Sequence, residues 1–526
     1  MCDSFSKRTL GQRTPKAVAS GGPGPISDSE SGRQAKRACS VARSRQLDLV
    51  AVAALIICLI AFRSRSFFTP FSDPTVGLYQ SIGQSWLRGH LPYTTTWEYR
   101  PPGFFAMWAL AIWMVGAALA LNVLAVLALG ATALALAKIA ITLDPRESRA
   151  TGWWAAGFLV LLSPVNDAIA GAAELQLSAF LAWSIYFALQ RTGRTRNVLL
   201  SGLLAGFALQ CKLTAIPPIV VPLLLLLVGT SQPLESAGLF LAGVAAPIAI
   251  EVLVYLRAHQ LAVLWNANIG TTLRYKSPAS EFSRNRVLVL RQLWTLAPQI
   301  ELAFLGLSRR ANRSQLASIG WLAAVFVSIV AAGEFYERQF VLLTAPVALL
   351  AALGFVRLLR LLEGRRAVQK SVAIVVVLLT FALHDYHETQ QGAMFAWHRL
   401  VLRESSWQLD QTGEVAAELR TLNAGSSSLY LIEQSPYLYD LLGVASPTVY
   451  AYSDYLLDPR LSTGAGIDGK AELARILATR PRFIVLSNLE DFRYAPDRVA
   501  LIKDALASSY TVVYRSTRFT IYRRSK

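Results

Sequence analysis

A cluster of charged residues and prolines follows the first long apolar run of the sequence. It contains Ser72-Asp73-Pro74, then Gly89-His90-Leu91-Pro92-Tyr93, and then Glu98-Tyr99-Arg100-Pro101-Pro102-Gly103. A carboxylate can accept a proton during a reaction, and an arginine can grip a phosphate with its planar guanidinium. Because this polar chemistry comes directly after a membrane-spanning run, it indicates a reaction on a molecule that reaches the protein through the bilayer.

Asp73 and Arg100 each have a purely structural alternative. Asp73 precedes a stretch of helical periodicity, 75–88, so it could simply cap a helix. Arg100 precedes two prolines that set the angle at which the chain enters the membrane surface, and its side chain could extend to lipid headgroups. Position in the sequence leaves both alternatives open.

Two isolated charges, Glu174 and Lys212, stand beside apolar runs. A charge at the centre of a membrane helix costs about 2.5–3.5 kcal/mol on insertion scales. The cost is smaller at the outer end, where we expect both residues, so a structural glutamate and a snorkelling lysine are the alternatives. Together with Glu251 they are expected near the same face as Asp73 and Arg100, and this favours one shared site.

The composition is that of a polytopic membrane protein. Of the 526 residues, 54% are hydrophobic and 16% are charged, whereas a soluble protein has about 25% charged residues. The net charge of +18 is spread over short loops. That pattern is typical of the positive-inside rule and does not predict nucleic-acid binding.

The distribution of basic residues predicts the topology. Residues 1–46 read as a disordered basic cytoplasmic tail, and 47–62 as an uncleaved first span. Three basic loops, at 191–196, 309–313 and 357–370, should also be cytoplasmic. This requires 104–116 to lie in the outer interface or to re-enter, within an outer loop 63–116. We therefore predict about eleven transmembrane helices in 47–384, including runs at 117–142 and 294–307, and an outer loop at 257–293.

Residues 385–526 change character and predict a small α/β extracytoplasmic domain. Short β-rich runs occur at 428–432, 448–452, 483–487, 511–515 and 518–523. Helical patterns cover 397–422, 470–479 and 497–508. Such alternation is typical of a compact α/β domain.

Cysteine and histidine spacings predict neither disulfides nor a metal site. The four cysteines lie in the tail or beside apolar runs, and the five histidines show no ligand spacing. We predict no cofactor, and dependence on a divalent metal stays open.

The order of these motifs resembles the GT-C glycosyltransferases, in particular the dolichyl-phosphate-mannose protein mannosyltransferase and aminoarabinose transferase group. The resemblance covers about residues 47–384 and rests on Asp73, the Gly89–Tyr93 turn, Arg100-Pro101-Pro102, Glu174, Lys212 after a short span, and Glu334–Arg338 before a proline-containing span. In this chain Pro74 follows the first acidic residue, and an arginine replaces the usual lysine before the prolines.

The resemblance implies a multi-pass enzyme of the plasma (bacterial inner) membrane, with its N-terminus cytoplasmic. It would transfer a sugar from a polyprenyl-phosphate donor to a lipid, glycan or protein acceptor on the outer face, with inversion. By that likeness Asp73 would be the catalytic base, assisted by Glu174, and the donor phosphate would bind Arg100, Lys212 and Arg338. Tyr93, Glu98 and Tyr336 would contact substrate. The alternatives are a lipid or solute transporter, or a cell-envelope polymer ligase or scaffold.

Overall fold

The computed structural model describes residues 48–525 with gaps at 64–65, 68, 70, 72, 144–147, 165–172, 191–194, 276–278, 307–312, 334, 363–366, 385–389, 391–393, 395–396, 399, 404–409, 488 and 492. The chain divides into two compact units, Met1–Cys58 and Leu59–Lys526. In the first unit the described residues belong to an apolar helix that begins at Asp48. The predicted tail 1–46 lies outside the described residues.

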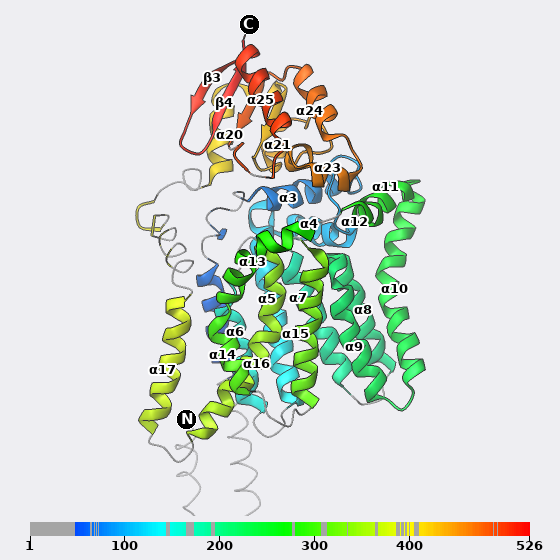
Figure 1. Cartoon of the computed structure of the whole chain (residues 1–526), viewed down its shortest axis with the longest axis vertical. Helices are drawn as coiled ribbons and strands as arrows, with labels where there is room; N and C mark the ends of the chain where they lie inside the picture. The colour runs from blue at the N-terminus through cyan, green and yellow to red at the C-terminus, as the bar shows by residue number, and fades with distance from the viewer. Residues whose placement is uncertain are drawn as a thin grey trace, which may run out of the picture. The chain divides into compact units, whose positions relative to one another are not determined.

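The second unit has a helical part made mainly of apolar helices (Figure 1). They are α5 (Ala117–Leu143), α6 (Ser148–Leu161), α7 (Ala173–Leu189), α8 (Thr195–Cys211), α9 (Ile216–Gly229), α10 (Pro233–Arg257), α14 (Ala297–Gly306), α15 (Arg313–Ala332), α16 (Val341–Leu361) and α17 (Ala367–His384). Among the described residues, four helices are long and apolar enough to cross a membrane: Ala117–Leu143, Pro233–Arg257, Gln315–Ala332 and Glu337–Leu361.

The number of spans remains a prediction. The run 294–307, which is expected to cross the membrane, contains the 10 described residues of α14. Residues 307–312, which follow α14, lie outside the described residues, and α13 (Ala279–Trp294) leads into α14 through a short turn.

Helices α8 and α10 pack backbone against backbone at small residues. A Cβ atom added at Gly202 would lie 2.0 Å from the carbonyl oxygen of Phe240, and one at Gly206 would lie 2.6 Å from that of Val244. The four-residue spacing of these glycines places both on one face of α8, as in other membrane helix pairs that approach closely. This packing fixes the end of α8, where Lys212 begins the next turn.

A further layer of helices lies between this helical part and the C-terminal domain (Figure 1). It contains α3 (Pro74–Leu87), α4 (Pro102–Val115), α11 (Leu261–Trp265), the π-helical turn η3 (Asn266–Gly270) and α12 (Thr271–Arg274). The helix expected at 104–116 is present as α4, and Gly116, with φ of 77°, separates it from α5. The predicted outer loop 257–293 is thus largely helical, because α13 follows α12.

The C-terminal domain is a four-stranded sheet with helices on both faces. Its strands are β1 (Leu429–Ile432), β2 (Phe483–Leu486), β3 (Tyr510–Arg515) and β4 (Thr520–Arg524), in the order β1-β2-β4-β3. β1 and β2 are parallel, and the other pairs are antiparallel. Its helices are α20 (Gln411–Thr421), α21 (Tyr437–Leu442), α22 (Asp454–Leu457), α23 (Pro459–Ala465), α24 (Gly469–Ala478) and α25 (Pro496–Ser509).

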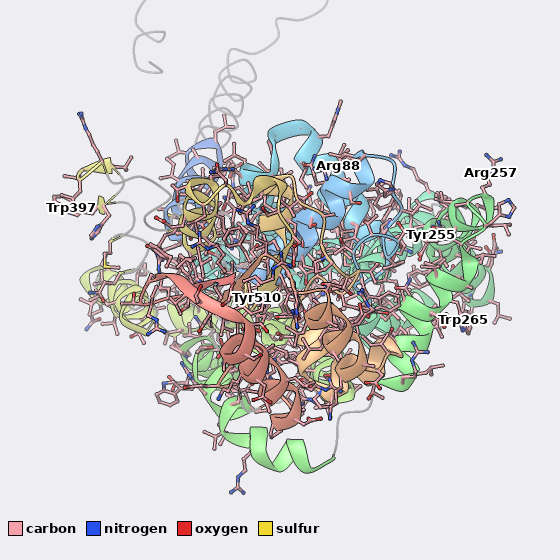
Figure 2. The ribbon with its side chains drawn as sticks, turned by 90° about the horizontal axis from the view of Figure 1, so that it is seen from above. Arg88, Tyr255, Arg257, Trp265, Trp397 and Tyr510 are labelled. Carbon is pink, nitrogen blue, oxygen red and sulfur yellow. The ribbon has the colours of Figure 1, made fainter. Side chains whose placement is uncertain are left out.

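Side-chain alternation along β1 explains the two cores of this domain. Leu429 and Leu431 pack in one cluster with residues of α20 and α21, whereas Tyr430 and Ile432 pack in the other with residues of α24 and α25. A strand whose successive side chains are all buried must be covered on both faces. Figure 2 looks onto this domain, with Tyr510 of β3 near the middle and Arg257 and Trp265 of the α10–α11 region toward the right margin.

Two expectations for the C-terminal domain are wrong. Residues 448–452 do not form a strand. The carbonyl of Val449 instead accepts a 2.7 Å hydrogen bond from the backbone N–H of Trp97, between α3 and α4. Residues 397–422 are not one helix. The chain is not helical at 401–403, and Asp410 caps a separate helix, α20, by accepting from the N–H groups of Thr412 and Gly413.

Candidate active site

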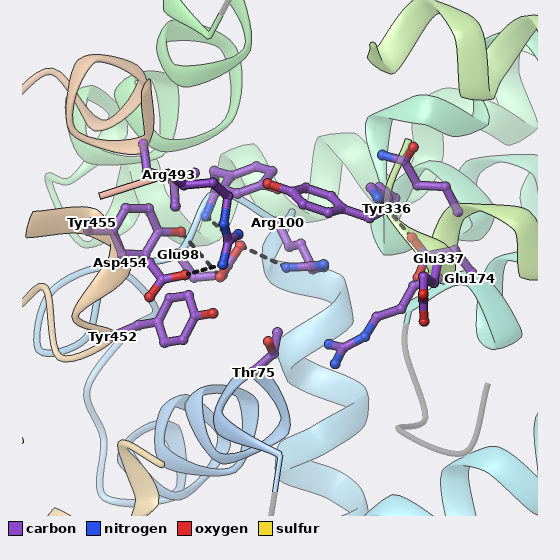
Figure 3. A pocket seen from close by; sticks show the side chains of 15 residues that line it. Thr75, Glu98, Arg100, Glu174, Tyr336, Glu337, Tyr452, Asp454, Tyr455 and Arg493 are labelled. Atoms are coloured by element: carbon purple, nitrogen blue, oxygen red, sulfur yellow. Dashed lines mark hydrogen bonds and ion pairs between the residues drawn. The ribbon is translucent and has the colours of Figure 1, made fainter. Parts of the chain in front are cut away.

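A polar cavity of about 290 Å³ lies where the segments that carry Arg100 and Arg338 meet the C-terminal domain (Figure 3). It is lined by four carboxylates, four cations and several aromatic and polar residues: Thr75, Glu98, Tyr99, Arg100, Glu174, Lys212, Tyr336, Glu337, Arg338, Gln339, Tyr452, Asp454, Tyr455, Leu461 and Arg493. Because the charges balance, an anion that enters must compete with a carboxylate for a cation.

A second cavity, an apolar groove of about 500 Å³, adjoins the first. Its walls come mainly from the start of α9, from η3 and α12, and from the end of α15, and include Ile216, Ile269, Leu273 and Ala331. The two cavities share five lining residues: Tyr99, Arg100, Lys212, Tyr455 and Leu461. The apolar space therefore opens into the polar space beside two cations.

Arg100 is held by neighbours from two parts of the chain. Its Nη1 donates to Glu98 Oε1 at 2.9 Å, and its guanidinium lies 4.8 Å from the centre of the Tyr79 ring. The second oxygen of Glu98 accepts a 3.3 Å hydrogen bond from the hydroxyl of Tyr455 in α22. Arg100 Nε is buried and has no partner among the described residues. The arginine is thus fixed in place but keeps a free donor.

Lys212 and Glu174 form the second buried pair of the site. Lys212 Nζ lies 2.8 Å from Glu174 Oε1, and both side chains are at least 90% buried. Lys212 is extended, with φ of −165°, between the end of α8 and the 3₁₀ turn η2 (Leu213–Ala215). Glu174 lies in the first turn of α7. Its Oε2 atom is buried without a partner among the described residues, so it can still accept a hydrogen bond.

Asp73 makes two contacts of different kinds. Its Oδ1 caps α3 by accepting from the N–H of Val76 at 2.9 Å, so the capping alternative is realised. Its Oδ2 forms an ion pair with Arg338, which belongs to the 3₁₀ turn η4 (Glu337–Phe340). Asp73 is not among the lining residues, but Arg338 and Thr75 are. The pair with Arg338 therefore connects Asp73 to the cavity.

The three expected substrate contacts lie in different places. Glu98 and Tyr336 line the polar cavity. Tyr93 lines neither cavity and is buried. Its hydroxyl donates to the carbonyl of Arg100 at 2.5 Å, and its backbone has φ of 71°. Its position indicates that it shapes the Arg100 loop rather than touching a ligand.

The C-terminal domain contributes a wall of the cavity that was not predicted from the sequence. Tyr452, Asp454, Tyr455, Leu461 and Arg493 come from the end of the chain and line the cavity (Figure 3). The signal that could have found them is the density of tyrosines around one aspartate in Tyr450-Ala451-Tyr452-Ser453-Asp454-Tyr455. Arg493 carries no comparable local signal.

Behind this wall, one hydroxyl lies between two carboxyl groups. Tyr494 Oη contacts both Glu433 Oε1 and Asp454 Oδ1, the latter at 2.9 Å. A hydroxyl can donate only one proton, so the other contact is favourable only if a carboxyl group carries a proton. Burial, together with the nearby Asp454 carboxyl, raises the pKa of Glu433 to about 8. We assign the proton to Glu433, which leaves Asp454 as the carboxylate on the cavity side.

Among the described residues, no group of three or more His, Cys, Asp and Glu side chains is placed to hold a metal ion.

Comparison with known proteins assigns the fold. No family model and no curated protein matches the chain. Solved structures do: ArnT from Cupriavidus metallidurans bound to undecaprenyl phosphate is 15% identical with a TM-score of 0.57, and its apo form is 14% identical with a TM-score of 0.58. Each match covers 91% of this chain and 98% of ArnT. The oligosaccharyltransferase AglB from Archaeoglobus fulgidus matches at 11% identity and a TM-score of 0.45, over 92% of this chain and 75% of AglB.

The chain therefore has the fold of the GT-C glycosyltransferases, as the order of its motifs predicted. Within that class its similarity to ArnT, an aminoarabinose transferase, extends over nearly the whole length of both proteins. This fold and the apolar helices make it a multi-pass membrane protein.

Proposed function

We propose that this protein is a glycosyltransferase that takes a sugar from a polyprenyl-phosphate donor and transfers it to a lipid, glycan or protein acceptor. One observation carries the proposal: an apolar groove and a polar cavity meet at Arg100 and Lys212. A polyprenyl-phosphate sugar has the same three parts in the same order, namely an apolar chain, an anion and a polar sugar. That ArnT, of the same fold, was solved with undecaprenyl phosphate supports this choice of donor.

In the proposed reaction the bond between the anomeric carbon and the phosphate oxygen breaks, and a bond to the acceptor oxygen forms. The departing phosphate keeps the electron pair and needs a fixed cation more than an acid. Arg100 is placed for this role because its Nε still has a free donor. Lys212 would bind the same phosphate, and Glu174 would hold the lysine in place. A single displacement of this kind inverts the anomeric carbon.

The proton of the acceptor hydroxyl needs a base, and we propose Asp73. Arg338 is paired with Asp73 Oδ2. Arg338 lines the cavity and is partly exposed, so it can turn toward an entering phosphate. That movement would free the carboxylate as the donor binds. The proposal thus gives Arg338 two partners, Asp73 before the donor binds and the phosphate afterwards.

The direct test is transfer from short-chain polyprenyl phosphates that carry common pentoses and hexoses, with the purified full-length protein in detergent. We expect one donor to be consumed, with release of free polyprenyl phosphate. Mass spectrometry of lipid-linked sugars in cells that lack the gene should show the same donor accumulating. If no donor is consumed and none accumulates, the proposal is wrong, and a transporter or an assembly scaffold becomes the better interpretation.

We also propose that the cavity opens on the outer side of the plasma membrane, with the N-terminus in the cytoplasm. Because the C-terminal domain forms part of the cavity wall, both must lie on one side. A reporter that is active only outside the cytoplasm, fused after Lys526, should be active. Activity of a cytoplasm-only reporter at the same position would reverse the proposed orientation.

A further inference from the structure

The place of the donor phosphate limits where the sugar can lie. In the proposed function the phosphate binds between Arg100 and Lys212, and Lys212 is paired with Glu174. Figure 3 shows Glu174 and Glu337 on one side of Arg100, and Tyr452, Asp454 and Tyr455 on the other. The anomeric carbon is joined directly to a phosphate oxygen, so the sugar must occupy the polar cavity beside the phosphate. The part of the polar cavity that the phosphate leaves for the sugar is the part bordered by the C-terminal domain.

That wall presents a carboxylate and a guanidinium side by side. Arg493 Nη2 lies 3.7 Å from Asp454 Oδ2, which is longer than a close ion pair. Neither group is free to form an ion pair with a charged ligand, because each already has a partner. Arg493 is already paired with Asp491 at 2.5 Å, and Asp454 Oδ1 already accepts from Tyr494 at 2.9 Å. What remains for a ligand is hydrogen bonding, with acceptor capacity on Asp454 and N–H donors on Arg493.

The wall is also held from behind, so its geometry does not depend on a ligand. Tyr494 fixes Asp454 and is itself fixed by Glu433 at the end of β1. Tyr455 is buried and bonded to Glu98, which holds Arg100. Preorganised polar groups of this kind discriminate well, because a ligand that lacks the matching hydroxyl leaves a buried group unpaired.

We propose that Asp454 and Arg493 of the C-terminal domain recognise hydroxyl groups of the transferred sugar, on the side of the ring away from the anomeric carbon. This inference rests on the proposed function and deepens it, because it assigns sugar selection to the C-terminal domain. The ligand class is a polyprenyl-phosphate sugar with free hydroxyls at those positions. An adjacent acceptor and donor of hydrogen bonds suit a pair of neighbouring hydroxyls.

The test is a substrate-and-residue double-mutant cycle on the full-length protein. For the short-chain donor that is transferred best, analogues lacking one hydroxyl each are compared in the wild type and in Asp454→Asn. In the wild type, loss of the recognised hydroxyl should lower kcat/KM about 10- to 100-fold, the range for a hydrogen bond to a charged group. With the complete donor, Asp454→Asn should have a kcat/KM lower than that of the wild type by a similar factor. With the analogue that lacks the recognised hydroxyl, the kcat/KM of Asp454→Asn should fall little further. Arg493→Lys should behave in the same way with the neighbouring hydroxyl.

A matched control is Glu472→Gln on α24, whose carboxylate is paired with Arg475 outside this cavity. It should leave the penalty for every missing hydroxyl unchanged. Penalties in Asp454→Asn equal to those of the wild type for all analogues would overturn the proposal. The proposal would also be overturned if Asp454→Asn changed only the KM for the acceptor, because the wall would then bind the acceptor.

Binding separates failure of this inference from failure of the proposed function. The rise in melting temperature with donor concentration reports affinity without turnover. If the affinity of the wild type depends on one hydroxyl of the donor and that of Asp454→Asn does not, the result supports sugar recognition even when no transfer occurs. Binding that is the same for all deoxy analogues in both proteins rules it out, whatever the enzyme does.

Discussion

The hydroxyl of Tyr455 donates to the carboxylate of Glu98 at 3.3 Å, although 357 residues separate the two in the sequence. Glu98 holds Arg100 with its other oxygen. A residue of the C-terminal domain thus helps to position the cation that we assign to the donor phosphate. This contact makes the domain part of the proposed site.

Tyr455→Phe should lower kcat about tenfold while the protein remains folded. The change removes one hydrogen bond, worth about 1.5–3 kcal/mol when the partner is charged, and lets Glu98 and Arg100 shift. Steady-state transfer from the short-chain donor measures it. Tyr514→Phe is the control, because Tyr514 also donates to a glutamate, Glu414, but outside the cavity. Equal rates for the Tyr455 and Tyr514 variants would show that this contact does not position Arg100.

Arg100→Ala should almost abolish use of the donor, and Arg100→Lys should retain part of the activity. A lysine keeps the charge beside the departing phosphate but loses the planar fork and the stacking on Tyr79. Because Arg100→Ala leaves Glu98 buried without its partner, the melting temperature must be measured with the rate. An Arg100→Ala protein that is folded and fully active would assign the phosphate to Lys212 alone.

Asp73→Asn should reduce transfer about 10²–10⁴-fold, the usual effect of losing a general base. Asparagine still caps a helix well, so α3 should survive. Asp468→Asn makes the same substitution at the cap of α24, where the carboxylate accepts from the N–H groups of Lys470 and Ala471. It should leave transfer unchanged. Near-normal activity of Asp73→Asn would reduce Asp73 to its capping role.

The stability of the protein should fall as the pH rises from about 5 to 8. The pKa of Glu433 is raised from 4.5 to about 8 in the folded state, so between these values the folded state binds a proton that the unfolded state has lost. The stabilisation is therefore complete below pH 4.5 and is lost as the pH rises through 8. Melting temperatures across this range measure it. A glutamine at position 433 cannot ionise, so in Glu433→Gln the melting temperature should fall less over this pH range than in the wild type. A pH profile of the melting temperature identical to that of the wild type would contradict the proton assigned to Glu433.

Gly202→Ala should destabilise the helical part more than Gly238→Ala. At Gly202 the added methyl group would collide with the backbone of Phe240 on α10, whereas at Gly238 it would meet nothing within 4 Å. In the absence of a collision, alanine is the better helix former by about 1 kcal/mol. Thermal unfolding in detergent compares the two variants. If both melt alike, α8 and α10 pack less closely than described.

Much of the donor side of the site could be predicted from the sequence. Glu174 and Lys212 were predicted because charges beside apolar runs are costly unless they have a partner or a task. Arg100 was predicted from its place before two prolines, and Arg338 from the resemblance to the GT-C glycosyltransferases. The structure brings all four to one cavity. The sequence could not give the pairing itself, because nothing in it shows which carboxylate lies beside which cation.

The side of the site that the C-terminal domain forms could not be predicted from the sequence, for a physical reason. Asp454 and Arg493 are ordinary polar residues of a soluble domain, where charges are common and carry no penalty that marks them. The segment 448–452 is rich in aromatic and β-branched residues, and this composition predicts a strand. Its backbone instead bonds to Trp97, between α3 and α4. Local propensity cannot reveal a partner 352 residues away in the chain.

The cavity joins Arg100, near the start of the chain, to Arg493, near its end. During synthesis the membrane helices and the segment that carries Arg100 are therefore made long before the last wall of the cavity. Until the C-terminal domain has been made and has folded, Arg100 and Lys212 face a cavity that is open on one side. Under the proposed function the protein is thus inactive throughout its own insertion, and a chain that stops early should occupy the membrane without reacting with the lipid donors around it.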